Sequence, residues 1–191
     1  MTSTLRVRGG WGGVAIIALA ATLIAAPGIS AGTGADVAPD VAVKAAFLFN
    51  FAKFVEWPAL TAGAPLLVCI VGNDRIASAF VETVRGQNIS GHTLNVSTLQ
   101  DSAMWKACHV LFIADGESRR SADGLDEIKS LPVLTVSDGK GFAAAGGIIE
   151  LYVEGGRMRF AINLEAADRS GLHLSSRLLG LAKVIRNSHV Q

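Results

Sequence analysis

Two segments decide the fold class: 66–71 (LLVCIV) and 109–114 (HVLFIA). Each is a short, unbroken apolar run, which is typical of a strand buried on both faces between layers of helices. A helix is expected before the first run, over 40–57, because Asp40 can cap it and Pro58 stops it. A second is expected to open at Gly72-Asn73-Asp74 and to end near Arg85. Alternating strands and helices predict a largely parallel sheet between helical layers.

The remaining pattern completes one α/β domain over 40–188. A weaker strand is expected over 93–98 near a sheet edge, and strands are expected over 133–137, 148–153 and 158–164. The last two flank Glu154-Gly155-Gly156-Arg157, which is a strong hairpin signal. Helical segments are expected over 100–106, over 118–129 with an interruption at Gly124, and over 175–186 as a closing helix. The sequence therefore predicts a single-domain three-layer α/β/α sandwich, with a mostly parallel sheet and a C-terminal antiparallel hairpin.

The first 35 residues have the features of a signal peptide. Arg6 and Arg8 form a basic start, residues 14–26 are an apolar run, and small residues follow Pro27 through Ala35. The alternative, an uncleaved anchor, needs about 20 apolar residues, and this run is shorter. We therefore expect residues 1–35 to be cleaved after export through the Sec route, which leaves a periplasmic protein.

Composition and motifs point away from several kinds of chemistry. Beyond residue 35 the chain has 15 basic and 16 acidic side chains, which argues against nucleic-acid binding. His92, His109, His173 and His189 are not at metal-ligand spacing, and no nucleophile elbow or phosphate-binding loop is present. We therefore expect no catalytic, cofactor-binding or metal site.

Two features of the sequence resemble functional sites. Residues 139–144 (GKGFAA) fit the loose pattern Gly-x-Gly-x-x-Ala, but only a short stretch separates them from the strand at Ile148, so we interpret them as a flexible βα loop. Asp115, Glu117 and Asp138 are expected at carboxyl ends of strands, where sites form in open sheets. We expect these three carboxylates to be solvated.

Cys69 and Cys108 are the two cysteines of the chain. In an exported protein an even count favours a disulfide, and two buried free thiols are the alternative. If the strands lie in the order 2-1-3, the strands that carry the cysteines are neighbours. Their α-carbons can then lie within the roughly 4.4–6.8 Å that a disulfide needs. We predict a structural disulfide between them.

Several segments, taken in order, resemble the YfiR-like family of periplasmic regulators. The resemblance covers about residues 41–186. It rests on 44–58 (KAAFLFNFAKFVEWP), 67–72 (LVCIVG), 108–113 (CHVLFI), 132–138 (PVLTVSD), 141–143 (GFA), 159–164 (RFAINL) and 171–179 (GLHLSSRLL).

The resemblance implies a regulatory function without catalysis. Such proteins inhibit an inner-membrane diguanylate cyclase by binding its periplasmic sensor domain, which lowers cyclic-di-GMP. An outer-membrane lipoprotein with a peptidoglycan-binding domain can sequester them, and they are typically disulfide-bonded homodimers. The resemblance assigns no partner-binding residue. An apolar patch is expected to make the contact, with 41–57 and the region near Leu178 as candidates that are more readily explained as core.

Two other classes of function stay open at this point. One is a periplasmic small-molecule-binding protein that feeds another membrane sensor, such as a histidine kinase. The other is a hydrolase with Ser137 or Ser175 as its nucleophile.

Overall fold

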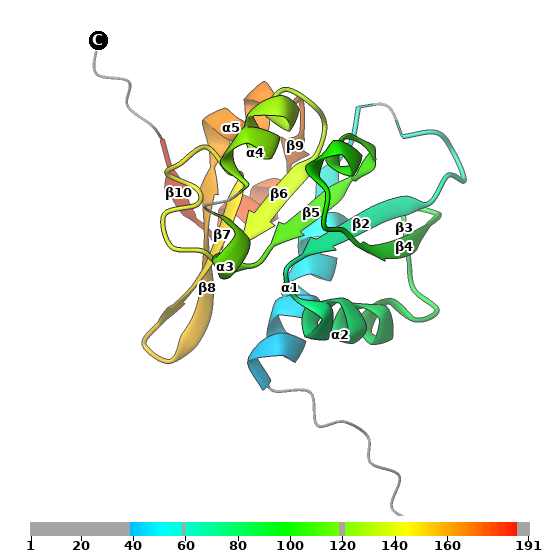
Figure 1. Cartoon of the computed structure of the whole chain (residues 1–191), viewed down its shortest axis with the longest axis horizontal. Helices are drawn as coiled ribbons and strands as arrows, with labels where there is room; N and C mark the ends of the chain where they lie inside the picture. The colour runs from blue at the N-terminus through cyan, green and yellow to red at the C-terminus, as the bar shows by residue number, and fades with distance from the viewer. Residues whose placement is uncertain (1–38, 59, 119–120, 187–191) are drawn as a thin grey trace, which may run out of the picture. The chain divides into compact units, whose positions relative to one another are not determined.

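The computed structural model describes residues 39–58, 60–118 and 121–186, and the expected signal peptide lies outside them. In the described part, eight strands form one sheet in the order β10-β8-β7-β6-β5-β2-β4-β3, and β1 and β9 form a small second sheet (Figure 1). The fold class predicted from the sequence is confirmed: the main sheet is mostly parallel and helices flank it.

The centre of the sheet has the expected strand order. β2 (Leu66–Val71) lies between β4 (His92–Thr98) and β5 (Val110–Ile113), and it is parallel to both. β6 (Leu134–Ser137) continues the parallel array beyond β5. The three strands β2, β5 and β6 are buried almost throughout, as their apolar composition requires.

Alternating side chains of these strands build two apolar clusters, one on each face of the sheet. Val68 and Ile70 of β2 join the cluster beneath α1 (Pro39–Lys53) and α2 (Asp74–Val84). Cys69 and Val71 face the opposite way, toward the 3-10 helix η1 (Ser102–Ala107) and α4 (Ala122–Ile128), which contribute Trp105 and Ile128. Because successive side chains of a strand point to opposite faces, one apolar strand serves both cores.

The antiparallel hairpin lies where the sequence places it. β7 (Ile149–Glu154) pairs with β8 (Arg157–Asn163), and their turn contains Gly155 and Gly156 with φ of 56° and 72°. A positive φ at both central residues is what a two-residue hairpin turn needs, and glycine adopts it without strain.

The first helix is shorter than predicted. α1 ends at Lys53, and the next residues form β1 (Val55–Glu56), which pairs with β9 (His173–Leu174). The Ser175 N–H also donates to the Phe54 carbonyl at 3.0 Å. The prediction that the helix reaches Trp57 was wrong, because residues 55–56 form backbone hydrogen bonds with a strand more than 100 residues away in sequence instead of a last helical turn.

The prediction of a closing helix over 175–186 was also wrong. α6 (Ser176–Leu179) ends at Gly180, and the chain continues as β10 (Lys183–Ile185), parallel to β8. Leu181, expected on the apolar face of that helix, is 74% exposed. The edge of β8 offers backbone hydrogen bonds that a segment with β-branched residues such as Val184 and Ile185 can use.

Gly124 does not interrupt the helical region as expected. The region holds two helices, α3 (Asp115–Ser118) and α4, and Gly124 lies buried inside α4. A β-carbon on Gly124 would lie 2.7 Å from the Trp105 ring, so the glycine allows α4 to pack against η1. Three elements were not predicted at all: β3 (Asn88–Ile89), α5 (Leu164–Arg169) and β9.

Candidate functional site

The carboxyl edge of the parallel strands is the place where open α/β sheets usually carry their sites. Asp115 and Asp138 meet there, after β5 and β6. The Asp115 N–H donates to Asp138 Oδ1 at 2.8 Å, and Lys44 of α1 donates from Nζ to Asp138 Oδ2 at 2.7 Å. The side chains of Lys44 and Asp138 are only 17% and 15% exposed. The prediction that Asp138 is solvated was therefore wrong. Its carboxylate is largely buried and forms an ion pair that connects α1 to the end of β6.

Glu117 lies over the end of β2. Gly72 follows β2 with a φ of +79°, and a β-carbon there would lie 2.5 Å from Glu117 Cγ. Gly72 thus provides both the left-handed backbone and the space in which the Glu117 side chain packs. The hollow beside them, about 410 Å³, lies at the strand ends where a cofactor or substrate would be expected. Its wall is built in part by Glu117 itself.

The loop that matches the dinucleotide pattern binds a carboxylate of its own chain. Glu150 of β7 accepts hydrogen bonds from Gly141 N–H and Ala143 N–H, both at 3.1 Å. These are the kind of backbone donors that a phosphate would need. Turns rather than a helix connect β6 to β7, so 139–144 is a loop as interpreted. It joins two strands instead of a strand and a helix, and its hydrogen bonds to Glu150 hold it in place, so the prediction of a flexible βα loop was wrong in these two respects.

Both serines considered as nucleophiles have structural roles. Ser137 is fully buried, and its Oγ accepts from the Gly139 N–H at 2.9 Å. Ser175 caps α6, with Oγ accepting from Leu178 N–H at 3.3 Å. Within the described residues, neither hydroxyl has a histidine among its hydrogen-bond partners.

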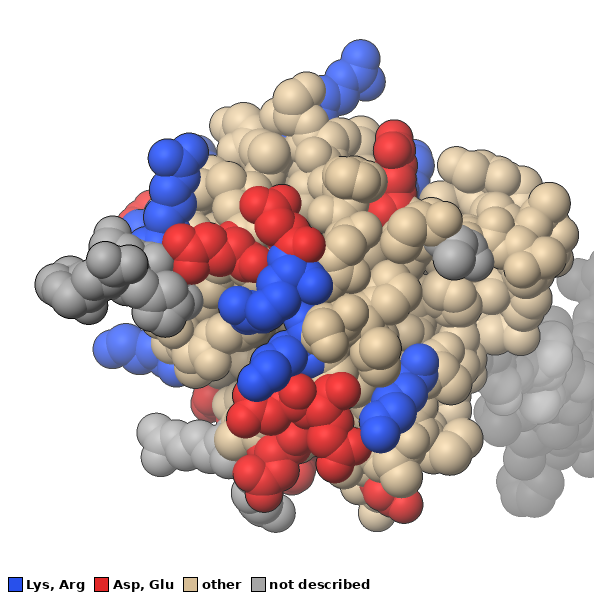
Figure 2. All heavy atoms as spheres, turned by 90° about the horizontal axis from the view of Figure 1, so that it is seen from above, with Lys and Arg blue, Asp and Glu red and all other residues tan. Residues whose placement is uncertain are grey.

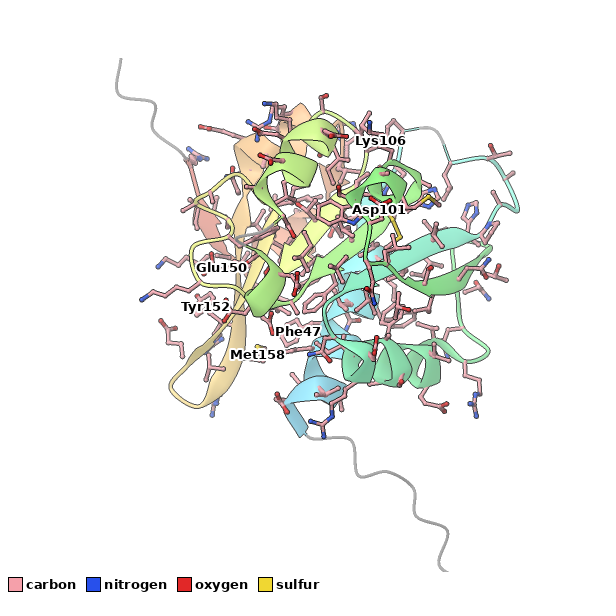
Figure 3. The ribbon with its side chains drawn as sticks, in the orientation of Figure 1. Phe47, Asp101, Lys106, Glu150, Tyr152 and Met158 are labelled. Carbon is pink, nitrogen blue, oxygen red and sulfur yellow. A yellow bond between two sulfur atoms is a disulfide. The ribbon has the colours of Figure 1, made fainter. Side chains whose placement is uncertain are left out.

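The structure contains the expected disulfide. Cys69 in β2 and Cys108 at the entry to β5 are bonded, with their α-carbons 5.9 Å apart. Figure 3 draws the bond in yellow, close to the labelled Asp101. Both residues belong to the buried cluster beneath η1, and Cys108 is only 3% exposed. A disulfide enclosed in apolar packing is a structural cross-link rather than an accessible redox switch.

His109, next to the disulfide, connects the start of β5 to the start of β2 and to the segment that follows β1. Its Nδ1 accepts from Leu67 N–H at 3.0 Å, and its carbonyl accepts from Trp57 Nε1–H at 3.3 Å. An accepting Nδ1 requires the neutral ring. Burial lowers the pKa of His109, and the nearby His92 lowers it further.

This arrangement makes stability depend on pH in a defined direction. Because the folded-state pKa of His109 is below its ordinary value of about 6.5, the unfolded chain binds the proton more readily. We expect the free energy of unfolding to fall as the pH drops from about 6.5 toward the folded-state pKa. In His109→Asn the amide oxygen can accept from Leu67 without titrating, so this variant should lose part of the pH dependence. Urea unfolding at a series of pH values measures it, and the exposed His173→Asn is the control. An unchanged pH profile in His109→Asn would contradict this assignment.

The Lys44–Asp138 pair should contribute more to stability than an exposed ion pair. We expect Lys44→Met to lower the free energy of unfolding by about 2 kcal/mol, because it leaves the carboxylate of Asp138 largely buried without its cation. Lys106→Met is the matched control. It breaks the Lys106–Glu127 pair, with N and O 3.0 Å apart and both side chains about half exposed, and should cost less than about 0.5 kcal/mol.

Denaturant unfolding of both variants compares these losses. Adding Asp138→Asn to Lys44→Met should recover part of the loss, because the buried charge is then gone. Equal losses in Lys44→Met and Lys106→Met would refute a special role for the buried pair.

The sequence carries a signal for the role of Lys44 that the sequence-based predictions do not include. Lys44 lies three residues after Val41 and four before Leu48, and so falls on the buried stripe of α1. A lysine on an apolar stripe indicates a buried ion partner. Nothing in the local sequence indicates Glu150 as the partner of the 139–146 loop, since that pairing depends on how β7 lies beside β6.

Most of the apolar side chains in the two proposed contact segments are buried or partly buried. The apolar stripe of α1 is buried, and Leu178 is 4% exposed, so both belong to the core. Among the described residues, the exposed large apolar side chains are spread over several elements: Val43, Val81, Met104, Val153, Leu181 and Val184. The face in Figure 2 carries acidic and basic side chains close together, without a field of one sign.

Among the residues that the structure describes, no group of three or more His, Cys, Asp or Glu side chains is arranged to hold a metal ion. None of the helices described is long and apolar enough to cross a membrane.

Fold and site together define an α/β domain whose polar groups at the usual catalytic edge hold its own elements in place. The YfiR/HmsC-like family model matches residues 41–183, and the chain belongs to this family. A partial structural similarity is found to a conserved domain protein from Vibrio cholerae O1 biovar El Tor, at 14% identity and a TM-score of 0.48. That match covers 75% of this chain and 59% of the other, so this chain spans less than two thirds of that protein.

Proposed function

We propose that this protein inhibits an inner-membrane diguanylate cyclase by binding its periplasmic sensor domain, and so lowers cyclic-di-GMP. The observation that carries the proposal, beside family membership, is that polar groups at the carboxyl edge are engaged in contacts within the chain. There Asp138 is bound by Lys44, Glu117 packs over Gly72, and Glu150 occupies the loop donors. An edge committed to internal contacts supports a binding function rather than catalysis.

The location follows from the sequence and the family. The 1–35 segment acts in this proposal as a Sec signal peptide that is removed on export, and 40–188 is the regulatory domain. The Cys69–Cys108 bond suits an oxidising compartment such as the periplasm.

The remaining partners are also part of the proposal. The regulator acts as a homodimer, and an outer-membrane lipoprotein with a peptidoglycan-binding domain sequesters it to release the cyclase. The chain has nearly balanced charge beyond residue 35, which favours contacts through apolar surface over contacts steered by net charge.

Deletion of the gene tests the regulatory function. We expect deletion to raise cellular cyclic-di-GMP and surface attachment, and complementation with the full chain to restore both. A version without residues 1–35 should fail to complement, because it stays on the wrong side of the membrane. In a strain whose cyclase is inactivated by substitutions in its active site, the same deletion should not raise cyclic-di-GMP.

Crosslinking identifies the partner. Periplasmic crosslinking followed by purification of the tagged protein should capture a membrane protein with a diguanylate cyclase domain. Unchanged cyclic-di-GMP after deletion, with no cyclase among the crosslinked proteins, would refute the proposal. Capture of a histidine kinase instead would support the alternative, a small-molecule-binding protein that feeds another sensor.

A further inference from the structure

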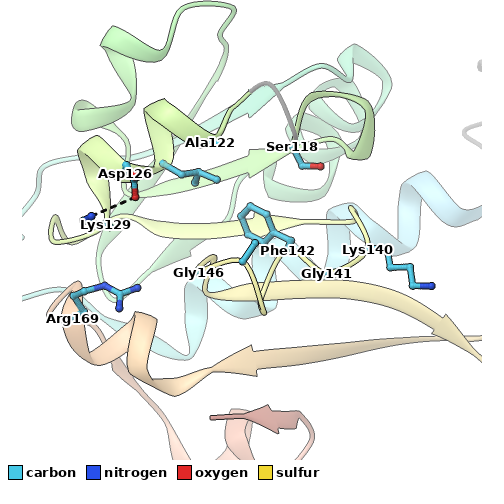
Figure 4. A pocket seen from close by; sticks show the side chains of 11 residues that line it. Ser118, Ala122, Asp126, Lys129, Lys140, Gly141, Phe142, Gly146 and Arg169 are labelled. Atoms are coloured by element: carbon cyan, nitrogen blue, oxygen red, sulfur yellow. Dashed lines mark hydrogen bonds and ion pairs between the residues drawn. The ribbon is translucent and has the colours of Figure 1, made fainter. Parts of the chain in front are cut away.

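A hollow of about 480 Å³ lies between α4, the loop over 139–146 and the end of α5. Figure 4 shows Phe142 in its middle, with Arg169 toward one end and Lys140 toward the other. Its volume falls in the range of small-molecule sites in proteins. The hollow does not overlap the Lys44–Asp138 pair, and the contacts described above leave its function unexplained.

The floor of this hollow is rigidly built. Phe142 is buried, and its ring packs against Gly147, where a β-carbon would lie 2.1 Å from the ring. The two loop hydrogen bonds to Glu150 fix the backbone on either side of Phe142. Asn163 adds a third constraint, since its Nδ2 donates to the Ala143 carbonyl at 2.7 Å. A site held in this way loses little freedom when a ligand binds.

The lining is apolar in the middle and basic at its ends. Ala122 and Leu125 of α4, with Phe142 and Ala145 of the loop, supply the apolar lining. The charged lining residues are Lys129, Lys140, Arg169 and Asp126. Asp126 lies 3.4 Å from Lys129, so these two charges largely offset one another.

Arg169 is the cation best placed to bind a ligand. Among the residues described, neither Arg169 nor Lys140 has an ion-pair partner. The Arg169 side chain points along the hollow toward Gly146 in Figure 4, whereas Lys140 extends away from Phe142. A guanidinium binds a carboxylate through two parallel hydrogen bonds, which suits it to this end of the hollow.

We propose that the hollow binds a small amphipathic carboxylate, with its anionic group on Arg169 and its apolar body over Phe142, Ala122 and Ala145. This binding is a property of the isolated protein and does not depend on the identity of the membrane partner.

Octanoate is the probe, and 1-octanol is its neutral counterpart. Calorimetric titration of the purified mature protein should show saturable binding of octanoate, and at least about tenfold weaker binding of octanol, because octanol lacks the charge. Amide NMR signals of Ala145 and Gly146 should shift with the same saturation curve. Absence of saturable octanoate binding up to about 10 mM would overturn the proposal.

Three variants test the assigned contacts. Arg169→Gln should weaken octanoate binding about tenfold, and Lys140→Gln no more than about twofold. Arg85→Gln, which removes an equal charge from an exposed pair on α2, is the matched control and should bind as the unaltered protein does. Equal affinity in Arg169→Gln and Arg85→Gln would place the ligand elsewhere.

A steric variant separates binding from folding. Ala122 is exposed at the start of α4, and leucine is nearly as favourable in a helix, so Ala122→Leu should fill the hollow without lowering the melting temperature. Loss of octanoate binding in this folded variant supports the site. Retained binding would contradict it.

Discussion

Replacing Cys69 and Cys108 together by alanine is expected to lower the free energy of unfolding of the oxidised protein by about 4 kcal/mol. The bond closes a loop between residues 39 apart in sequence, and its loss returns conformational entropy to the unfolded chain. For a domain of this size the melting temperature should fall by about 10 °C. Differential scanning calorimetry of the oxidised protein and the variant measures the difference.

Reduction supplies the control for this prediction. After dithiothreitol in denaturant, the unaltered protein should unfold with the same midpoint as the double alanine variant, because both then lack the cross-link. The variant itself should not respond to dithiothreitol. Two titratable thiols per chain in oxidised protein purified from the periplasm would show that the bond does not form there.

Phe51→Ala is expected to cost about 3–5 kcal/mol, because it leaves a cavity where α1 meets the sheet. Phe51 is 1% exposed, and its ring centroid lies 5.0 Å from that of Phe160 on β8 and 5.6 Å from that of Phe47. The same substitution at Phe49 is the matched control. Phe49 is partly buried on the same helix and lies beneath the Lys53 ammonium, so its loss should cost about 1 kcal/mol.

Chemical denaturation of the two variants compares these costs directly. If Phe51→Ala does not fold, Phe51→Leu provides the measurement, with an expected loss of about 1–2 kcal/mol. Equal losses in free energy of unfolding at Phe51 and Phe49 would mean that the buried contact of α1 with β8 contributes no more to stability than the partly buried ring of Phe49.

The sequence by itself determined the centre of the sheet. The apolar runs at β2 and β5 predict strands because a short run of apolar residues without polar alternation is typical of a strand buried on both faces. The disulfide was predicted because these two strands were expected to be neighbours, as they are in the structure. The hairpin followed from Gly155-Gly156, whose positive φ values a two-residue turn requires. These features depend on local composition and on simple rules of strand order.

Only the tertiary structure decided the conformation of two short segments, 55–56 and 183–185, and the contacts of the charged side chains. Val55–Glu56 and Lys183–Ile185 are strands because β9 and β8 offer them hydrogen bonds, and neither partner is near in sequence. Asp138 is anchored because α1 places Lys44 within 2.7 Å of it. The contacts at the carboxyl edge and the lining of the hollow beside α4 have the same physical origin. Side chains from distant segments meet at both places, and the local sequence pattern carries no information about which side chains meet.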